Sequence, residues 1–268
     1  LKHGQDSDYA HFFDIDWAED NGAGGNIALP VLGAPGDTEA LKLEHIDGED
    51  VLVYYDHVFP LAPGSYAGLD DDPCAVHERQ HYRLMYWRDG IISYRRFFSI
   101  NGLAGVRQED EDVFNATHSC LRDLVGEGLI DGVRVDHPDG LTDPSGYLTR
   151  LRELIGQDAW LVVEKILGVD EPLDPRLNVD GTTGYDALRE FDGAFVNTDA
   201  ATALGAVALR FSGTTWDAHA VEKAEWMLKA RVAEDELAAE IRRLARAVRH
   251  DSLSSAGSQV SDAALTEV

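Results

Sequence analysis

The sequence contains little sulfur and no long apolar run. Its 268 residues include two cysteines and two methionines, and Cys74 and Cys120 show neither a disulfide framework nor the spacing of metal ligands. No run of about 18 apolar residues is present to cross a membrane. These absences argue against a disulfide-stabilised secreted domain and against a helical membrane protein. They favour a reducing, cytoplasmic setting.

Positive charge is also scarce. Lysine and arginine together number 23 against 49 acidic residues, which gives a formal net charge of −26. Nucleic acids and anionic membranes both require a basic face on their protein partners, so we expect neither as a partner. The acidity fits a neutral substrate and a heavily solvated surface, and it is compatible with a halophilic source.

What is present is enough apolar material for a substantial core, because 44% of the residues are hydrophobic. Both ends of the chain look cut. Leu1 is not an initiator methionine and opens no signal peptide. The last residues follow Ser261-Asp262, a pair suited to begin a helix. We therefore expect a fragment of a longer protein.

The segment from Leu129 to Leu167 contains two strand-like apolar runs, over 129–136 and 160–164. Between them, apolar residues recur at helical spacing from 145 to 157. Strand, helix and strand in this order predict a βαβ unit with parallel strands. In such folds the chemistry lies at the carboxyl ends of the strands. Asp136 and Glu164 end these two strands, so we place the active site there.

The rest of the chain divides into an irregular first part and a helical last part. Residues 1 to about 50 are rich in Gly, Asp and Pro, whereas residues 200–249 carry the apolar stripe of a helical subdomain. Residues 170–183 are predicted to form a polar loop. The other predicted elements are a strand over 26–32, a strand over 51–55, a helix from 72 or 73 to 86, a helix over 109–125 and helices from 186 onward.

One short motif points to different chemistry. His77 to His81 matches H-E-x-x-H, which on a helix places two histidines on one face, where they can bind zinc with Glu78 as the base. No third ligand and no second part of a metalloprotease signature follow. We therefore favour His77 as a surface residue, His81 as a pocket or packing residue, and no metal site. A zinc peptidase stays an alternative.

The two strand-end carboxyl groups have different surroundings. Arg134 lies two residues before Asp136, on the same side of the strand, and favours the ionised carboxylate. Glu164 follows the apolar run 160–163, where desolvation favours the protonated form. One ionised and one protonated carboxyl group are what retaining glycoside chemistry requires: the first attacks the anomeric carbon and the second protonates the leaving oxygen.

These residues carry a family resemblance. Residues 132–137 (GVRVDH) and 163–167 (VEKIL) resemble the strand-4 and strand-5 motifs of the α-amylase superfamily. More narrowly, a series of segments resembles the maltooligosyltrehalose synthase family, in that family's order and over nearly the whole chain. These segments are residues 12–17 (FFDIDW), 80–84 (QHYRL), 94–98 (YRRFF), 100–101 (IN), 103–105 (LAG), 136–141 (DHPDGL), 164–167 (EKIL) and 181–186 (GTTGYD).

The resemblance implies an α/β fold, namely a partial TIM (β/α)8 barrel that carries the region of strands 4 and 5. It implies three parts: an inserted irregular subdomain over 1–108 after barrel strand 3, a barrel core segment over 109–190, and a truncated helical subdomain over 191–268. By this resemblance Asp136 is the nucleophile, Glu164 the general acid/base and Arg134 the residue that holds the nucleophile's charge. Further implied substrate contacts are His137, His81, Tyr82, Arg95, Lys165 and Tyr185.

The implied reaction is an intramolecular transglucosylation. The reducing-end α-1,4 glucose of a maltooligosaccharide becomes an α,α-1,1 (trehalose) end, with no cofactor and no metal. The superfamily's strand-3 motif is expected before residue 1 and its third carboxylate after residue 268, so we expect this chain alone to be inactive. The alternatives are another hydrolase or glucanotransferase of the superfamily and a non-catalytic carbohydrate-binding fragment.

Overall fold

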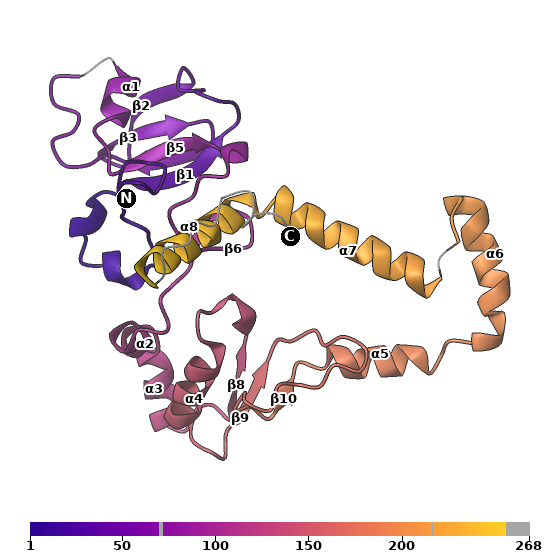
Figure 1. Ribbon diagram of the computed structural model, residues 1–268. Coiled ribbons are helices and arrows are strands. Elements are labelled where there is room, and N and C mark those ends of the chain that lie inside the picture. Colours follow the sequence, from indigo (N-terminus) through magenta and orange to yellow (C-terminus); the bar gives the residue numbers. More distant parts are fainter. Residues whose placement is uncertain (70–71, 216, 256–268) are drawn as a thin grey trace. The chain divides into compact units, whose positions relative to one another are not determined.

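The computed structural model describes residues 1–69, 72–215 and 217–255, and the side chains as far as residue 248 (Figure 1). The chain forms two compact units. The first unit is Leu1–Gly105 together with Glu222–Val268, and the second unit is Val106–Val221.

The first unit is built around short β-sheets. Strands β1 (Ile27–Leu32) and β5 (Tyr82–Tyr86) pair in parallel. Strands β2 (Leu41–Ile46), β3 (Glu49–Tyr54) and β4 (His57–Pro60) form an antiparallel sheet with β3 in the centre. The remaining short elements are the 3-10 turns η1 (Gly4–Asp6), η2 (Ala10–Phe12) and η3 (Trp87–Asp89), helix α1 (Pro73–His77), and strands β6 (Arg96–Phe97) and β7 (Ile100–Ala104).

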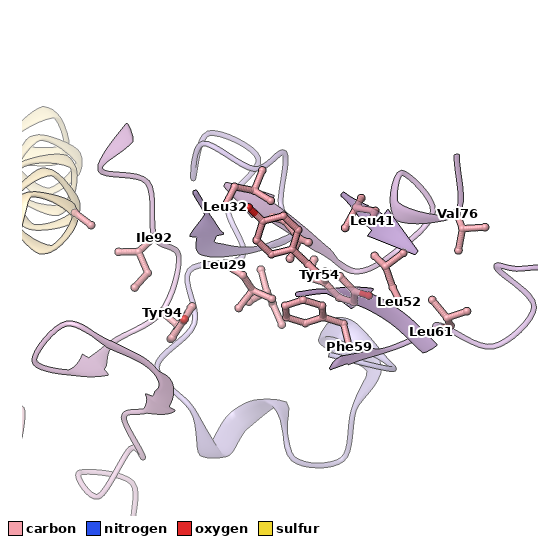
Figure 2. Packing of buried hydrophobic residues seen from close by; sticks show 14 residues of the cluster. Leu29, Leu32, Leu41, Leu52, Tyr54, Phe59, Leu61, Val76, Ile92 and Tyr94 are labelled. Carbon is pink, nitrogen blue, oxygen red and sulfur yellow. The ribbon is translucent and has the colours of Figure 1, made fainter. Parts of the chain in front are cut away.

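The core of this unit lies where the sheets meet. Figure 2 shows leucines of β1, β2 and β3 together with Tyr54 and Phe59, and Leu52 and Tyr82 are fully buried. The strands predicted over 26–32 and 51–55 are confirmed as β1 and β3. The expectation that residues 1 to about 50 are mostly irregular holds for 1–26 and 33–40, apart from two short 3-10 turns, but β2 and the start of β3 add strands that it did not include. β2 alternates apolar and polar residues only over 41–44, and His45 interrupts the alternation where an apolar residue is expected, so the strand signal is short.

The helix predicted from 72 or 73 to 86 is only partly correct. Asp72 caps α1, since its carboxylate accepts the Ala75 amide at 3.0 Å, and Pro73 is the first helical residue as predicted. The helix ends at His77 because the buried Gln80 side chain donates a hydrogen bond from its Nε2 to the Val76 carbonyl at 2.6 Å, in place of a further helical bond. The chain then becomes β5, in which the buried tyrosine and leucine side chains alternate with more exposed ones.

Two long helices, α7 (Ala218–Glu234) and α8 (Ala238–Ser255), follow later in the chain. Within the first unit, helix α8 packs on the N-terminal segment 1–105: Ala239 and Ala245 are buried, and Glu240 accepts the Arg96 guanidinium at 2.6 and 3.2 Å. Arg243 reaches Asp14 at 2.8 Å. The predicted helical character of 200–249 is confirmed, and the end of the subdomain predicted over 191–268, residues 256–268, lies outside the described residues.

The second unit contains a parallel sheet with the strand order β10-β9-β8. Its strands are β8 (Gly132–Val135), β9 (Trp160–Val163) and β10 (Gly181–Thr182). Its helical elements are α2 (Glu111–Thr117), α3 (Ser119–Gly126), η4 (Pro138–Gly140), α4 (Pro144–Ile155), α5 (Tyr185–Gly193), η5 (Thr198–Ala200) and α6 (Ala201–Ser212). Leu148 and Leu151 of α4 are fully buried against Leu161 and Val163 of β9, which gives this unit its own core.

The predicted βαβ unit is confirmed as β8, α4 and β9, with parallel pairing. The helix predicted over 109–125 is interrupted at His118, where α2 ends and α3 begins. The His118 ring stacks on Phe114, and its Nε2 lies 3.0 Å from the hydroxyl of Tyr147 in α4. This tertiary contact stabilises the interruption between α2 and α3. Residues 170–183 are not all loop, because Gly181 and Thr182 pair with β9. Among the described residues, no helix combines the length and the apolar character needed to span a membrane.

Candidate active site at the ends of parallel strands

The ends of β8 and β9 bring the two predicted carboxylates to one edge of the sheet. Val135 and Val163 are direct partners in the parallel register, and Asp136 and Glu164 are the residues that follow them. The amide of Glu164 donates to the Val135 carbonyl at 2.8 Å, which ties the two strand ends together. Because neighbouring strands are only about 4.8 Å apart, side chains leaving this edge start close to each other.

Arg134 contacts both carboxylates. One guanidinium nitrogen lies 2.7 Å from Asp136 Oδ1, and the other lies 3.9 Å from Glu164 Oε1. The contact between Arg134 and Asp136 that strand alternation predicts is therefore present, and the contact with Glu164 is an addition from the neighbouring strand. A single planar guanidinium spans both acids, so their carboxyl groups converge on one small region.

The two carboxylates differ in exposure. The side chain of Asp136 is 63% exposed, whereas that of Glu164 is 25% exposed. The apolar run before Glu164 thus buries it only in part, since Trp160 itself is largely exposed and only Leu161 and Val163 point into the core. Glu164 is thus the more enclosed of the two acids and Asp136 the more accessible one.

His137 connects the two acids through its backbone. Its amide donates to Glu164 Oε2 at 3.1 Å. The residue has a φ of 42°, in the left-handed region, which costs a residue with a Cβ about 1–2 kcal/mol. Gly140 accommodates the imidazole, since a Cβ there would lie 2.6 Å from His137 Nδ1. Backbone strain of this kind persists only where the surroundings enforce it, and it is common at functional sites.

Lys165 is held by an acid that the sequence reasoning missed. Its ammonium group donates to both carboxylate oxygens of Asp139, at 2.8 and 2.9 Å. Asp139 follows β8 and Lys165 follows β9, so this ion pair links the same two loops that carry the carboxylates. The position of Asp139, three residues after Asp136 in a segment already noted for its motif, was the signal that could have identified it.

Tyr185 begins helix α5 just beyond β10. The Thr182 hydroxyl donates to Asp186 at 2.8 Å and accepts the Gly184 amide at 3.1 Å, which fixes the start of the helix. This hydroxyl is also the main reason that the pKa of Asp186 lies below its usual value. The Tyr185 side chain is 43% exposed. It therefore follows the third parallel strand, as Asp136 and Glu164 follow the first two.

The other three predicted contacts, His81, Tyr82 and Arg95, belong to the first unit. Tyr82 is fully buried and donates its hydroxyl to the Pro60 carbonyl at 3.2 Å, and burial raises its pKa. That placement accounts for Tyr82 as a core residue. The His81 ring packs closely over Gly4. Arg95 pairs with Asp14 at 3.3 Å.

The apparent zinc motif does not form a ligand face. Helix α1 ends at His77, so His81 lies beyond it and the two histidines do not share a helical face. The expectation that His77 is a surface residue is wrong: it is buried, and its Nε2 accepts the Leu84 amide at 3.1 Å. Among the described residues, no group of three or more His, Cys, Asp and Glu side chains could hold a metal ion.

The geometry of the second unit suits a double displacement at a sugar carbon. An exposed carboxylate next to a guanidinium is available to attack, and a more enclosed carboxyl group on the adjacent strand is available to move a proton. The two loops that carry them are tied together by the ion pair between Lys165 and Asp139.

No family model matches the chain. A Mycobacterium tuberculosis protein that is provisionally named maltooligosyl trehalose synthase is 50% identical over 248 residues, which are 92% of this chain and 31% of that protein. The structure of maltooligosyltrehalose synthase from Arthrobacter ramosus matches with a TM-score of 0.79 and 44% identity, again over 92% of this chain and 31% of the other. A hypothetical maltooligosyl trehalose synthase from Sulfolobus tokodaii matches with a TM-score of 0.74 and 33% identity over 92% of this chain and 32% of the other.

The likeness extends across both units of the chain, and these relatives agree in the activity that their names state. The chain spans about a third of the length of the curated relatives it matches.

Proposed function

We infer that this chain belongs to the maltooligosyltrehalose synthase family and contributes the nucleophile and the general acid/base of that activity. Asp136 is assigned as the nucleophile, Glu164 as the acid/base, and Arg134 as the residue that positions both. The observation that carries the assignment is the contact of one guanidinium with two strand-end carboxylates, at 2.7 and 3.9 Å. The substrate is a maltooligosaccharide and the setting is cytoplasmic.

The reaction proceeds in two displacements. Asp136 attacks the anomeric carbon of the penultimate glucose while Glu164 gives its proton to the O4 leaving oxygen of the reducing-end glucose. The released glucose turns within the site. Its anomeric hydroxyl then gives a proton to Glu164 and its oxygen attacks the anomeric carbon, which frees Asp136 and forms the α,α-1,1 bond. Because water competes for the covalent intermediate, the site has to exclude it.

The remaining site residues support this chemistry in different ways. His137 holds Glu164 through its amide, and Lys165 links the two strand-end loops through Asp139. Tyr185, next to the third strand, offers an aromatic face to a sugar ring. His81 and Arg95 are proposed sugar contacts from the first unit, whereas burial removes Tyr82 from that role.

The fold we propose for the second unit is part of a (β/α)8 barrel. Parallel strands that alternate with helices, with carboxylates at their carboxyl ends, are the arrangement such barrels use. β8 and β9 take the places of strands 4 and 5. The proposed domain division remains 1–108, 109–190 and 191–268.

The test compares the full-length protein with the 268-residue chain, using maltopentaose as substrate. The full-length protein should remove reducing ends without shortening the oligosaccharide, and the 268-residue chain should form no trehalose end. Asp136→Asn and Glu164→Gln should each lower kcat at least about 10³-fold. Asp123→Asn is the matched control, because Asp123 is exposed on helix α3 of the same unit, and it should retain activity.

Two results would refute the proposal. Shortened products with new reducing ends would identify a hydrolase of the α-amylase superfamily instead. Full activity of Asp136→Asn would remove these carboxylates from the chemistry and leave a non-catalytic carbohydrate-binding role.

A further inference from the structure

A cavity of about 490 Å³ that is open to the solvent lies at the surface of the first unit, beside the turn that joins β3 to β4. Its volume falls within the range of small-molecule sites. Its lining includes Asp37, Tyr54, Tyr55, Asp56 and His57. All of these residues belong to the first unit, so the cavity shares no residue with the pair Asp136 and Glu164.

The backbone of Tyr55 is in an unfavourable conformation for its residue type. Its φ is 49°, in the left-handed region, where a side chain costs about 1–2 kcal/mol. The neighbouring turn, between β2 and β3, has the same two-residue length and uses Asp47-Gly48, a pair that tolerates such angles. Two-residue hairpins require this conformation of their first loop residue, and the unusual feature here is that a tyrosine occupies the position in place of Gly, Asn or Asp. It places an aromatic ring, on a side chain 71% exposed, at the rim of the cavity.

The cavity residues next to the Tyr55 ring are held in place by hydrogen bonds and packing. The Tyr54 hydroxyl donates to Asp37 Oδ2 at 2.7 Å and accepts the Gly33 amide at 2.8 Å. The Tyr54 ring supports Tyr55 edge to face, with the ring centroids 4.8 Å apart. Tyr54 itself is buried in the core of the sheets (Figure 2), so these groups are fixed in position before any ligand arrives.

The chemistry of the lining selects a class of ligand. Among the described residues that line the cavity, none is a lysine or an arginine and two carry carboxylates, so an anion is disfavoured. A metal ion is disfavoured too, because the described residues offer no cluster of three or more suitable ligands. Carboxylate oxygens accept hydrogen bonds from hydroxyl groups, and an exposed tyrosine ring offers a flat apolar face. A neutral sugar ring presents both complements, namely hydroxyl donors at its edge and C–H groups on its faces.

We propose that this cavity is a carbohydrate-binding site that takes a glucosyl unit of an α-glucan, stacked on Tyr55 and hydrogen-bonded by Asp37 and Asp56. The choice of an α-glucan among neutral sugars rests on the proposed function. Binding there would hold a long glucan on the enzyme without taking part in bond exchange.

The experiment is isothermal titration calorimetry of the 268-residue chain with β-cyclodextrin, which presents glucosyl faces but has no reducing end to be processed. Wild type should bind, and Tyr55→Asn should weaken binding by about tenfold or more, which corresponds to about 1.4 kcal/mol. Tyr55→Trp keeps an aromatic face and should bind within about threefold of wild type. Tyr9→Asn is the matched control, since Tyr9 is 67% exposed in the same unit but away from the cavity lining, and it should bind as wild type does.

Stability measurements separate this role from a structural one. Because asparagine tolerates the left-handed conformation, Tyr55→Asn should unfold in urea at the same or a higher midpoint while it loses affinity. A loss of both stability and affinity would overturn the proposal, as would undiminished binding by Tyr55→Asn or no binding by wild type. Equal affinity for cellohexaose would overturn the assignment to α-glucans.

Failure of this site and failure of the proposed synthase activity can be told apart. If the full-length protein forms trehalose ends but the chain does not bind β-cyclodextrin, only the cavity assignment falls. If Tyr55-dependent binding is found and no trehalose ends form, the cavity assignment stands and the synthase assignment falls.

Discussion

Arg134 and His137 define the candidate site at the scale of single residues. Arg134 touches Asp136 along its own strand and Glu164 across to the next one. The backbone amide of His137 donates a hydrogen bond to Glu164, and His137 adopts an unfavourable left-handed backbone conformation to do so. The first contact follows from strand alternation and was foreseeable. The contacts with Glu164 depend on the register of two strands that are separated by a helix, and no local pattern encodes them.

A second residue-scale feature is the buried imidazole of His77, which makes stability depend on pH. Burial is the main reason that its pKa is lowered, while the nearby Glu78 carboxylate raises the pKa and Arg83 lowers it by a smaller amount. The folded state therefore needs the neutral ring, whose Nε2 accepts the Leu84 amide. Above the unfolded-state pKa of about 6.5, the stabilisation that the neutral His77 ring contributes to the folded state is fully present. As the pH falls from there toward the lower folded-state pKa, the unfolded chain binds the proton first and stability is lost.

His77→Gln tests this dependence, because glutamine can accept the Leu84 amide and does not titrate. Urea midpoints of wild type should fall between about pH 7.5 and pH 5.5, and those of the variant should fall less. His57→Gln serves as the control, since His57 is exposed, and it should follow the wild-type curve. Parallel curves for all three proteins would show that His77 is not the group responsible.

At the scale of elements, the packing of helix α8 on the N-terminal segment of the first unit depends on a small polar network. Arg96 of β6 has a side chain only 7% exposed, and it is held by Glu240 at 2.6 Å and by Asn101. Arg243 of the same helix pairs with Asp14, which also contacts Arg95. A buried guanidinium that loses its carboxylate keeps its desolvation cost, so Glu240 has more influence than a surface acid.

Glu240→Gln should therefore loosen α8. We expect a loss of about 1.5–3 kcal/mol in the free energy of unfolding, the range for a hydrogen bond to a charged group. Limited proteolysis should also cut faster near residues 235–237, between α7 and α8. Glu222→Gln is the control, since Glu222 is exposed on α7 and lies outside the segment that is cut, and it should leave both measurements unchanged. Equal cutting of the two variants would exclude a role for the pair Arg96 and Glu240 in docking.

Whether the sequence predicted an element correctly depended on whether local patterns or tertiary contacts determine that element. Strands β8 and β9 and helix α4 were predictable because their apolar residues repeat with the period of the element they form. The helix predicted to continue to Tyr86 failed because tertiary contacts decided its end: Gln80 satisfies the Val76 carbonyl, and β1 offers β5 a parallel partner. Local propensity is a weak guide where such contacts compete with it.

For the whole molecule, the net charge of −26 should govern stability in solution. Like charges repel in the compact state, and salt shortens the screening length from about 10 Å at 0.1 M to about 3 Å at 1 M. The thermal midpoint should therefore rise when NaCl is increased over this range, by about 2–4 °C for each kcal/mol of relieved repulsion. Sucrose at equal osmolality is the control, because it is preferentially excluded but does not screen charge. An equal rise in both would assign the effect to solvent exclusion.

The sequence by itself determined the chemistry that the chain offers. The types and order of the strand-end residues, the βαβ pattern and the excess of acidic residues were all legible from spacing and composition, because they are properties of neighbouring residues. Only the tertiary structure decided which of these groups meet. Strand pairing and packing bring together residues that are distant in sequence, and the fold rather than the position along the chain sets the distances between them. Examples are the contact of Arg134 with Glu164, the pairing of Lys165 with Asp139, the burial of His77 and Tyr82, and the cavity beside Tyr55.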